Sequence, residues 1–145
     1  MLNTIHTKIS TTLAALTGTG KPLSVVYSDP LEDNAQITAF PAVVIGLGQF
    51  TNQYMSSAEN KIGVTYKLYL CQEVQQAGMA KAHRILREVA DKILEKFGDD
   101  WNQGETTEGH RIWWTMDVGG SAYDLNEKIL YYELNLTANL SYDVS

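Results

Sequence analysis

The chain has 145 residues, a net charge of −6 and a pI near 4.9, and 44% of its residues are apolar against 19% that are charged. These values predict one globular domain over 1–145 with a sizeable core, and they exclude a disordered chain and a tight nucleic-acid binder, which needs clustered basic side chains. No apolar run approaches the ~20 residues that span a bilayer, the N-terminus is a poor signal peptide, and the lone Cys71 rules out an internal disulfide framework, so we expect synthesis and folding in a reducing cytoplasm.

The N-terminal part of the chain predicts one helix followed by two strands. Apolar residues recur every three to four positions over 2–16, which is typical of a helix with one buried face. The segment 18–22 then ends the helix; it lacks the glycine spacing and the Ser or Thr of a phosphate-binding P-loop, so we reject that site. Strands are expected at 23–28 and 42–48, and the glycines of the second strand indicate a bulge or a close backbone contact.

A long hairpin is predicted next. The polar segment 51–63 joins the second strand to a third strand at 64–72, whose residues alternate between the two faces of the sheet. The set expected to face the main helix is Val64, Tyr66, Leu68 and Leu70.

The main helix is predicted over residues 79–97. Its apolar residues repeat at the spacing of one helix face, and Gly98 is a residue suited to a helix end. The opposite face carries five basic and three acidic side chains, so it is locally basic on an acidic protein. Because an apolar stripe must be buried, we expect this helix to lie on one face of the sheet.

Two strands complete the chain. After an acidic loop at 99–110, a strand is predicted at 111–118, and Gly119–Gly120 breaks it before a polar connection. The last strand, 129–142, exceeds the usual strand length, so it is either bent or pairs in part with a neighbouring subunit. The predicted fold class is α+β: a mostly antiparallel sheet, packed by the main helix and the N-terminal helix, in the order α-β-β-β-α-β-β. Every connection except the helical crossover is expected to be able to form a hairpin.

The sequence does not indicate catalytic or metal-binding residues. None of His6, His83 and His110 has the partner spacing of a helical metal site, and we expect the last two at the surface. Cys71 lies on a strand with no histidine close in sequence, so we expect a small buried hydrophobic residue rather than a nucleophile. We therefore predict no catalytic, cofactor-binding or metal-binding residues, and a protein that is not an enzyme.

Paired aromatic residues predict the character of the second sheet face. Trp113–Trp114 and Tyr131–Tyr132 each send one ring to either face of a strand, so one ring of each pair belongs to the core. The other rings, together with Tyr69, form an aromatic patch. Such a patch either marks a partner surface or is covered by the N-terminal helix.

In length and order of elements the chain resembles the tail terminators of tailed bacteriophages, the tail-completion family typified by the minor tail protein U of lambda-like phages. The resemblance is carried by the N-terminal helix, the apolar strand led by Pro41, the hairpin with a polar tip, the helix 79–97 and the two terminal strands. It implies a homo-oligomeric ring, most often a hexamer, in the tail or neck of the virion. Such a ring caps the tail tube, ends tail elongation and provides the head–tail joining surface. The implied partners are the tail tube protein and the head–tail connector protein; DNA passes through without specific binding, and no cofactor or membrane is involved.

Two sets of functional residues are expected in such a ring. The subunit or partner interface is predicted at Arg84, Arg87, Trp113, Tyr131 and Tyr69. Acids facing the lumen would repel DNA and keep its transit from stalling on the wall. These acids are predicted to be Asp29, Glu32, Asp33, Asp99, Asp100, Glu105 and Glu108.

Alternatives stay open at this point. The chain fits another phage neck or tail structural protein, either a head–tail connector or a tube subunit, and a tube subunit would polymerise into long stacks. A further alternative is a small ligand-binding or enzymatic domain with a pocket near Trp113, Tyr131 and His110. The missing acid–base pair and nucleophile argue against that last reading.

Overall fold

The computed structural model describes residues 2–29, 36–54, 59–75, 77–105 and 111–143, and this part of the chain forms two helices and six strands. The helices are α1 (Leu2–Ala14) and α2 (Met79–Asp99). The strands are β1 (Val25–Tyr27), β2 (Ala42–Tyr54), β3 (Glu59–Glu73), β4 (Asn102–Glu105), β5 (Arg111–Asp124) and β6 (Ile129–Asp143). The α+β class and the order of the predicted elements are confirmed, with β4 as one additional short strand.

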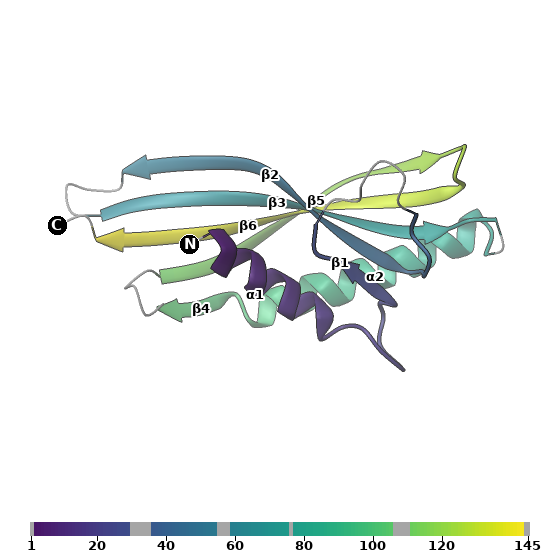
Figure 1. Cartoon of the computed structure of the whole chain (residues 1–145), viewed down its shortest axis with the longest axis horizontal. Coiled ribbons are helices and arrows are strands. Elements are labelled where there is room, and N and C mark those ends of the chain that lie inside the picture. The colour runs from purple at the N-terminus through teal and green to yellow at the C-terminus, as the bar shows by residue number, and fades with distance from the viewer. Residues whose placement is uncertain (1, 30–35, 55–58, 76, 106–110, 144–145) are drawn as a thin grey trace.

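All six strands form one sheet in the order β1-β2-β3-β6-β5-β4. Neighbouring strands are antiparallel except β1 and β2, which run parallel, so a hairpin between the first two strands is wrong. β6 lies inside the sheet and pairs with β3 over its whole length, from Ile129 to Asp143, while β5 occupies its other side. Its length is therefore accommodated within one chain by a strongly twisted sheet, whose long strands cross one another in Figure 1.

Both helices cover the same face of this sheet (Figure 1). The predicted stripe of α2 is buried at Ala82, Leu86, Val89, Ile93 and Phe97. α1 adds Ile5, Ile9 and Leu13 to the same core. The alternating residues of β3 that were expected to face the main helix are all buried in this core.

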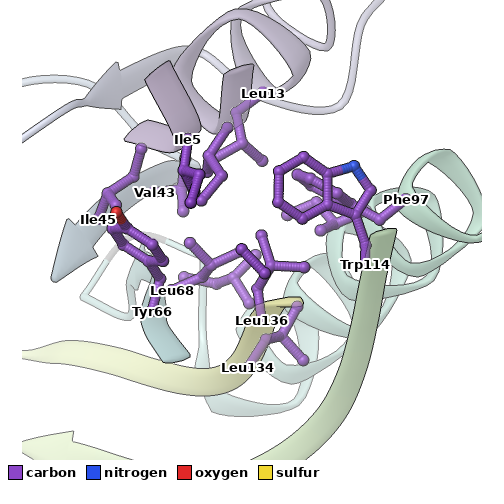
Figure 2. Packing of buried hydrophobic residues seen from close by; sticks show 14 of the residues in the cluster. Ile5, Leu13, Val43, Ile45, Tyr66, Leu68, Phe97, Trp114, Leu134 and Leu136 are labelled. Carbon is purple, nitrogen blue, oxygen red and sulfur yellow. The ribbon is translucent and has the colours of Figure 1, made fainter. Parts of the chain in front are cut away.

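The core is closed by contacts between residues far apart in the chain. Figure 2 shows Ile5 and Leu13 of α1 directed towards the same interior as Leu68 and Leu136 of the sheet. Trp114 is the core member of its tryptophan pair, and its ring meets Phe97 edge to face, with centroids 5.9 Å apart and planes at 83°.

Three details near the C-terminal half differ from expectation. α2 continues through Gly98, which is not among the glycines with positive φ, and the backbone N–H of Asp100 donates to Lys96 O at the helix end. The expected loop 99–110 contains the edge strand β4. β5 does not stop at Gly119–Gly120; it passes through a register shift between Val118 and Ser121 and pairs with β6 up to Asp124.

Candidate interaction surfaces

The second face of the sheet carries an apolar cluster that no described helix covers, because α1 lies beside α2 on the opposite face. The alternative in which α1 covers the aromatic residues is therefore wrong. We call this cluster the tyrosine patch. Its buried members are Ala42, Cys71 and Ile129, and its partly buried members are Val25, Tyr27, Ile37, Phe40, Val44, Tyr69 and Tyr131. Tyr69 and Tyr131 thus lie in one cluster, on the neighbouring strands β3 and β6.

A hollow of about 440 Å³ opens on the tyrosine patch. Most of its lining is apolar, and the charged group at its rim, Glu133, is already bound to Lys67, with 2.9 Å between Oε1 and Nζ. The described lining consists of Ile37, Val44, Tyr69, Gly120, Ser121, Ala122, Tyr131 and Glu133. A hollow of this composition suits an apolar or aromatic side chain of a partner better than a charged small molecule.

Trp113 lies on the same face but does not join the tyrosine patch. It pairs with Asn139 of β6 whereas Tyr131 pairs with Ala122, so about 26 Å of strand separates the two rings. The Nζ of Lys61 lies 5.6 Å from the centroid of the Trp113 ring, within reach of a cation–π interaction. The expected pocket near Trp113, Tyr131 and His110 is therefore wrong, because the rings of Trp113 and Tyr131 lie too far apart to line one pocket. His110 lies outside the described residues.

Polar contacts fill the surface between Trp113 and the tyrosine patch. The hydroxyls of Thr65 and Thr137 lie 3.0 Å apart on β3 and β6, and Asn139 Nδ2 donates to Thr115 Oγ1 at 3.1 Å. These hydrogen bonds satisfy polar groups in the middle of this face, where Asn139 itself is buried. Among the described residues, the partly buried aromatic side chains Trp113, Tyr69 and Tyr131 lie towards the two ends of this face.

Two ionisable groups of the tyrosine patch are held neutral by burial. Desolvation raises the pKa of the Cys71 thiol to about 12, and the charge of Glu127 adds to the effect. Desolvation also raises the pKa of Tyr131 to about 12, assisted by Cys71, Glu127 and Asp124. Cys71 is buried as expected, and with so few thiolates at neutral pH it is a poor nucleophile.

The histidines and the acidic residues give no metal site among the described residues: no group of three or more His, Cys, Asp or Glu side chains there is arranged to hold an ion. His83 is not free at the surface, since its Nδ1 lies 2.7 Å from the hydroxyl of Tyr132 and the side chain is half-buried. Neither of the two described helices has the length and apolar character needed to cross a bilayer.

A second hollow, which we call the α2 groove, lies between α2 and the bulge of β5. Its volume is about 590 Å³, and Leu94 and Val118 are among its apolar residues. Arg84 and Arg87 line it from α2 and have no carboxylate at ion-pair distance within the described chain, whereas Lys92 and Lys96 of the same helix pair with Glu95 and Asp100. The remaining described lining is Glu88, Ala90, Asp91, Gly119, Gly120, Ser121, Tyr132, Glu133 and Leu134.

Two functional candidates were missed from the sequence alone. Val118 was expected to end a strand, yet its side chain is 69% exposed at the α2 groove. Leu125 was placed within a polar connection, yet it is 77% exposed on the turn between β5 and β6. The sequence did contain one indication for Leu125. It is the single apolar residue next to Asp124, Asn126 and Glu127, in a segment without the apolar periodicity that predicts burial.

The predicted lumen acids are attached to opposite edges of the sheet. Asp29 follows β1, is highly exposed and lies 3.7 Å from Nε2 of His6. Asp99 ends α2 and Asp100 follows it; both are exposed, and Asp100 Oδ2 contacts Lys96 Nζ at 3.2 Å. The backbone of Glu105 ends β4 opposite Arg111. Glu32, Asp33 and Glu108 lie outside the described residues.

Comparison with models of known protein families and with curated proteins gave no match for this sequence. The function is therefore inferred from the chain's own surfaces and from the resemblance in element order.

Proposed function

We propose that the chain is a tail terminator of a tailed bacteriophage, a structural virion protein rather than an enzyme. It forms a ring on the finished tail tube, ends tail elongation and provides the head–tail joining surface around a DNA conduit. The observation that carries the proposal is the second sheet face, where the tyrosine patch has no helix over it. An apolar surface of this kind is typical of a protein that buries it against neighbouring subunits or partners.

The outer strands of the sheet support the same proposal. β1 pairs with β2 only at Ala42–Val44, and β4 pairs with β5 only near Arg111–Trp113, so within the described chain the outer edges of β2 and β5 have no strand partner over most of their length. Each of these strands also has a register shift, between Leu47 and Phe50 in β2 and at the glycine pair of β5. Bulges hinder uncontrolled strand pairing, which favours a limited assembly through side chains over an open stack of strands.

The charge of the chain fits a conduit for DNA. A net charge of −6 includes exposed acids at Asp29 and Asp99, and acidic walls repel the phosphate backbone. In the proposed ring these acids face the lumen, and the locally basic side of α2 lies against an acidic neighbouring surface. Basic residues along the channel would contradict the conduit.

The proposal is tested on the purified protein. Light scattering and negative-stain microscopy are expected to show a ring with a central hole, either for the free protein or after addition of purified tail tubes. A terminator can stay monomeric until it meets the tube, so the decisive measurement is binding to tube ends. A compact monomer that leaves tube ends bare contradicts the proposal.

A different station in the same machinery is the main alternative. A tube subunit would grow into long stacks rather than stop at one ring, and a head–tail connector would bind the head side of the neck in place of the tube end. Microscopy of mixtures with tubes distinguishes all three. The hollow on the tyrosine patch leaves a small ligand-binding domain as a lesser alternative, which would be favoured by a monomer that binds a metabolite.

A further inference from the structure

We propose that the α2 groove receives the turn between β5 and β6 of a second copy of the chain, with Leu125 as its anchor. This inference names the subunit contact of the ring proposed above and rests on that function only for the closure of the ring. The contact itself is argued from the two surfaces.

The turn is a rigid projection. Asp124 Oδ1 accepts hydrogen bonds from the backbone N–H groups of Asn126 at 2.9 Å and Glu127 at 3.1 Å, and the backbone N–H of Lys128 donates to Asp124 O at 2.7 Å. Lys128 completes the turn with a φ of 58°. A turn fixed in this way loses little conformational entropy on binding, so an apolar side chain that it carries is an effective anchor.

The apolar parts of the two surfaces match. Leu125 and Val118 are the most exposed of the large apolar side chains among the described residues. Leu125 does not occupy the groove of its own chain, since most of its surface is open to solvent. Placing it against Val118 and Leu94 of a neighbour would bury the most exposed apolar groups of both copies in a groove of about 590 Å³.

The charged parts match as well. The groove presents Arg84 and Arg87, which have no carboxylate partner in the described chain. Beside its anchor the turn carries Asp124, whose Oδ1 accepts the hydrogen bonds of the turn, and the exposed Glu127, whose Oε2 lies 3.4 Å from the hydroxyl of Tyr131 in the same chain. The groove also contains Glu88 and Asp91, which suit the ammonium group of Lys128, and Glu133, which Lys67 already neutralises.

A second copy is the occupant that these features favour. Turn and groove are different surfaces of one chain, so the contact is heterologous and repeats from copy to copy until a ring closes. In Figure 1 the turn lies towards the right-hand end of the molecule, and the Leu125 that it carries is 77% exposed. It is therefore free to reach a neighbour.

Disulfide trapping tests the proximity directly. The double variant Val118→Cys with Leu125→Cys is expected to give a ladder of covalent multimers on oxidation under assembly conditions. Neither single variant should give more than a dimer, and native Cys71 is buried and does not interfere. If the double variant stays monomeric while wild-type protein assembles, the contact is wrong.

A charge swap tests the specificity. Arg87→Glu and Glu127→Lys are each expected to weaken self-association at least tenfold, and the two changes in one chain are expected to restore it. Lys92→Glu, the same charge change on α2 outside the groove, is the matched control and should have little effect. An unaltered unfolding transition shows that each variant is folded. Loss of assembly without rescue in the double variant overturns the pairing.

The outcomes separate this contact from the function. Rings on tube ends without Val118–Leu125 crosslinks refute the contact and leave the terminator role standing. Crosslinked multimers that neither close into rings nor bind tubes support the contact and refute the terminator role.

Discussion

Gly119 fixes the shape of β5 at the scale of one residue. A methyl group at this position would lie 2.8 Å from the backbone oxygen of Glu133, a distance that forces the backbone to move. We expect Gly119→Ala to lower the free energy of unfolding by about 1–3 kcal/mol, the usual cost of overpacking. Gly120→Ala is the matched control, because nothing lies within 4 Å of its added methyl group. Equal urea-unfolding midpoints for the two variants would contradict the close approach of the strands.

The buried thiol of Cys71 gives the protein a predictable weakness at alkaline pH. Its pKa rises from an ordinary value of 9.0 to about 12 on folding, so between these pH values the unfolded chain has lost a proton that the folded chain retains. The free energy of unfolding is therefore expected to fall as pH rises above about 9. Cys71→Ala should show a shallower fall in unfolding experiments between pH 9 and 11. Identical slopes for both proteins would show that the thiol does not contribute.

At the scale of one element, α2 has two different sides: one is buried in the core, and the other lines the α2 groove. Leu86 is fully buried under the sheet, and we expect Leu86→Ala to lower the free energy of unfolding by about 2–5 kcal/mol, through lost burial and the cavity left behind. Leu94 is half-buried at the α2 groove, so Leu94→Ala should destabilise the fold distinctly less. Thermal unfolding measures both. A larger loss for Leu94→Ala would mean that the groove side of α2 carries the core.

The helices and the apolar parts of the long strands could be predicted because each has a period that one packing partner explains. The link expected at 51–63 is wrong in its extent, since 51–54 belong to β2 and 59–63 to β3. The stripe of α2 and the alternation of β3 are local patterns, and both faced the core as expected. β4 has no such pattern, since Asn-Gln-Gly-Glu is polar throughout and its pairing depends on β5. Gly119–Gly120 was expected to break a strand, but the neighbouring β6 continues the ladder past the bulge.

A surface could be predicted only where the face of the sheet was enough to decide which side chains meet. Tyr69 and Tyr131 share a face and lie on adjacent strands, so they meet. Trp113 shares the face but pairs far along β6, a separation that depends on register rather than on face. The α2 groove could not be predicted, because it depends on where α2 lies relative to the bulge of β5. No local pattern in the sequence gives the distance between the helix and the bulge.

At the scale of the whole molecule, the core and the interaction surfaces divide the sheet between them. Both helices stabilise one face, which leaves the other face, with the tyrosine patch, available to partners. Apart from Leu134, the described residues that line the α2 groove lie outside the buried core, as does the turn after β5, so subunit contacts there need not change the fold. Assembly and stability are therefore expected to respond to different substitutions.

The acidic surface allows the conduit to be tested on the assembled ring. Asp29→Lys with Asp99→Lys replaces two exposed acids that we place in the lumen, and the altered ring is expected to retain double-stranded DNA in a salt-sensitive way, because clustered cations release counterions from the phosphates. Asp117→Lys is the control, because it changes one exposed acid on β5 that lies outside the predicted lumen set. A double control on β5 that also changes Asp124 is not suitable, because Asp124 accepts the hydrogen bonds of the turn. The single variants Asp29→Lys and Asp99→Lys are therefore compared with Asp117→Lys in gel-shift measurements at matched salt. If Asp117→Lys retains DNA as strongly as either of them, net charge rather than position governs binding, and the assignment of these acids to the lumen is wrong.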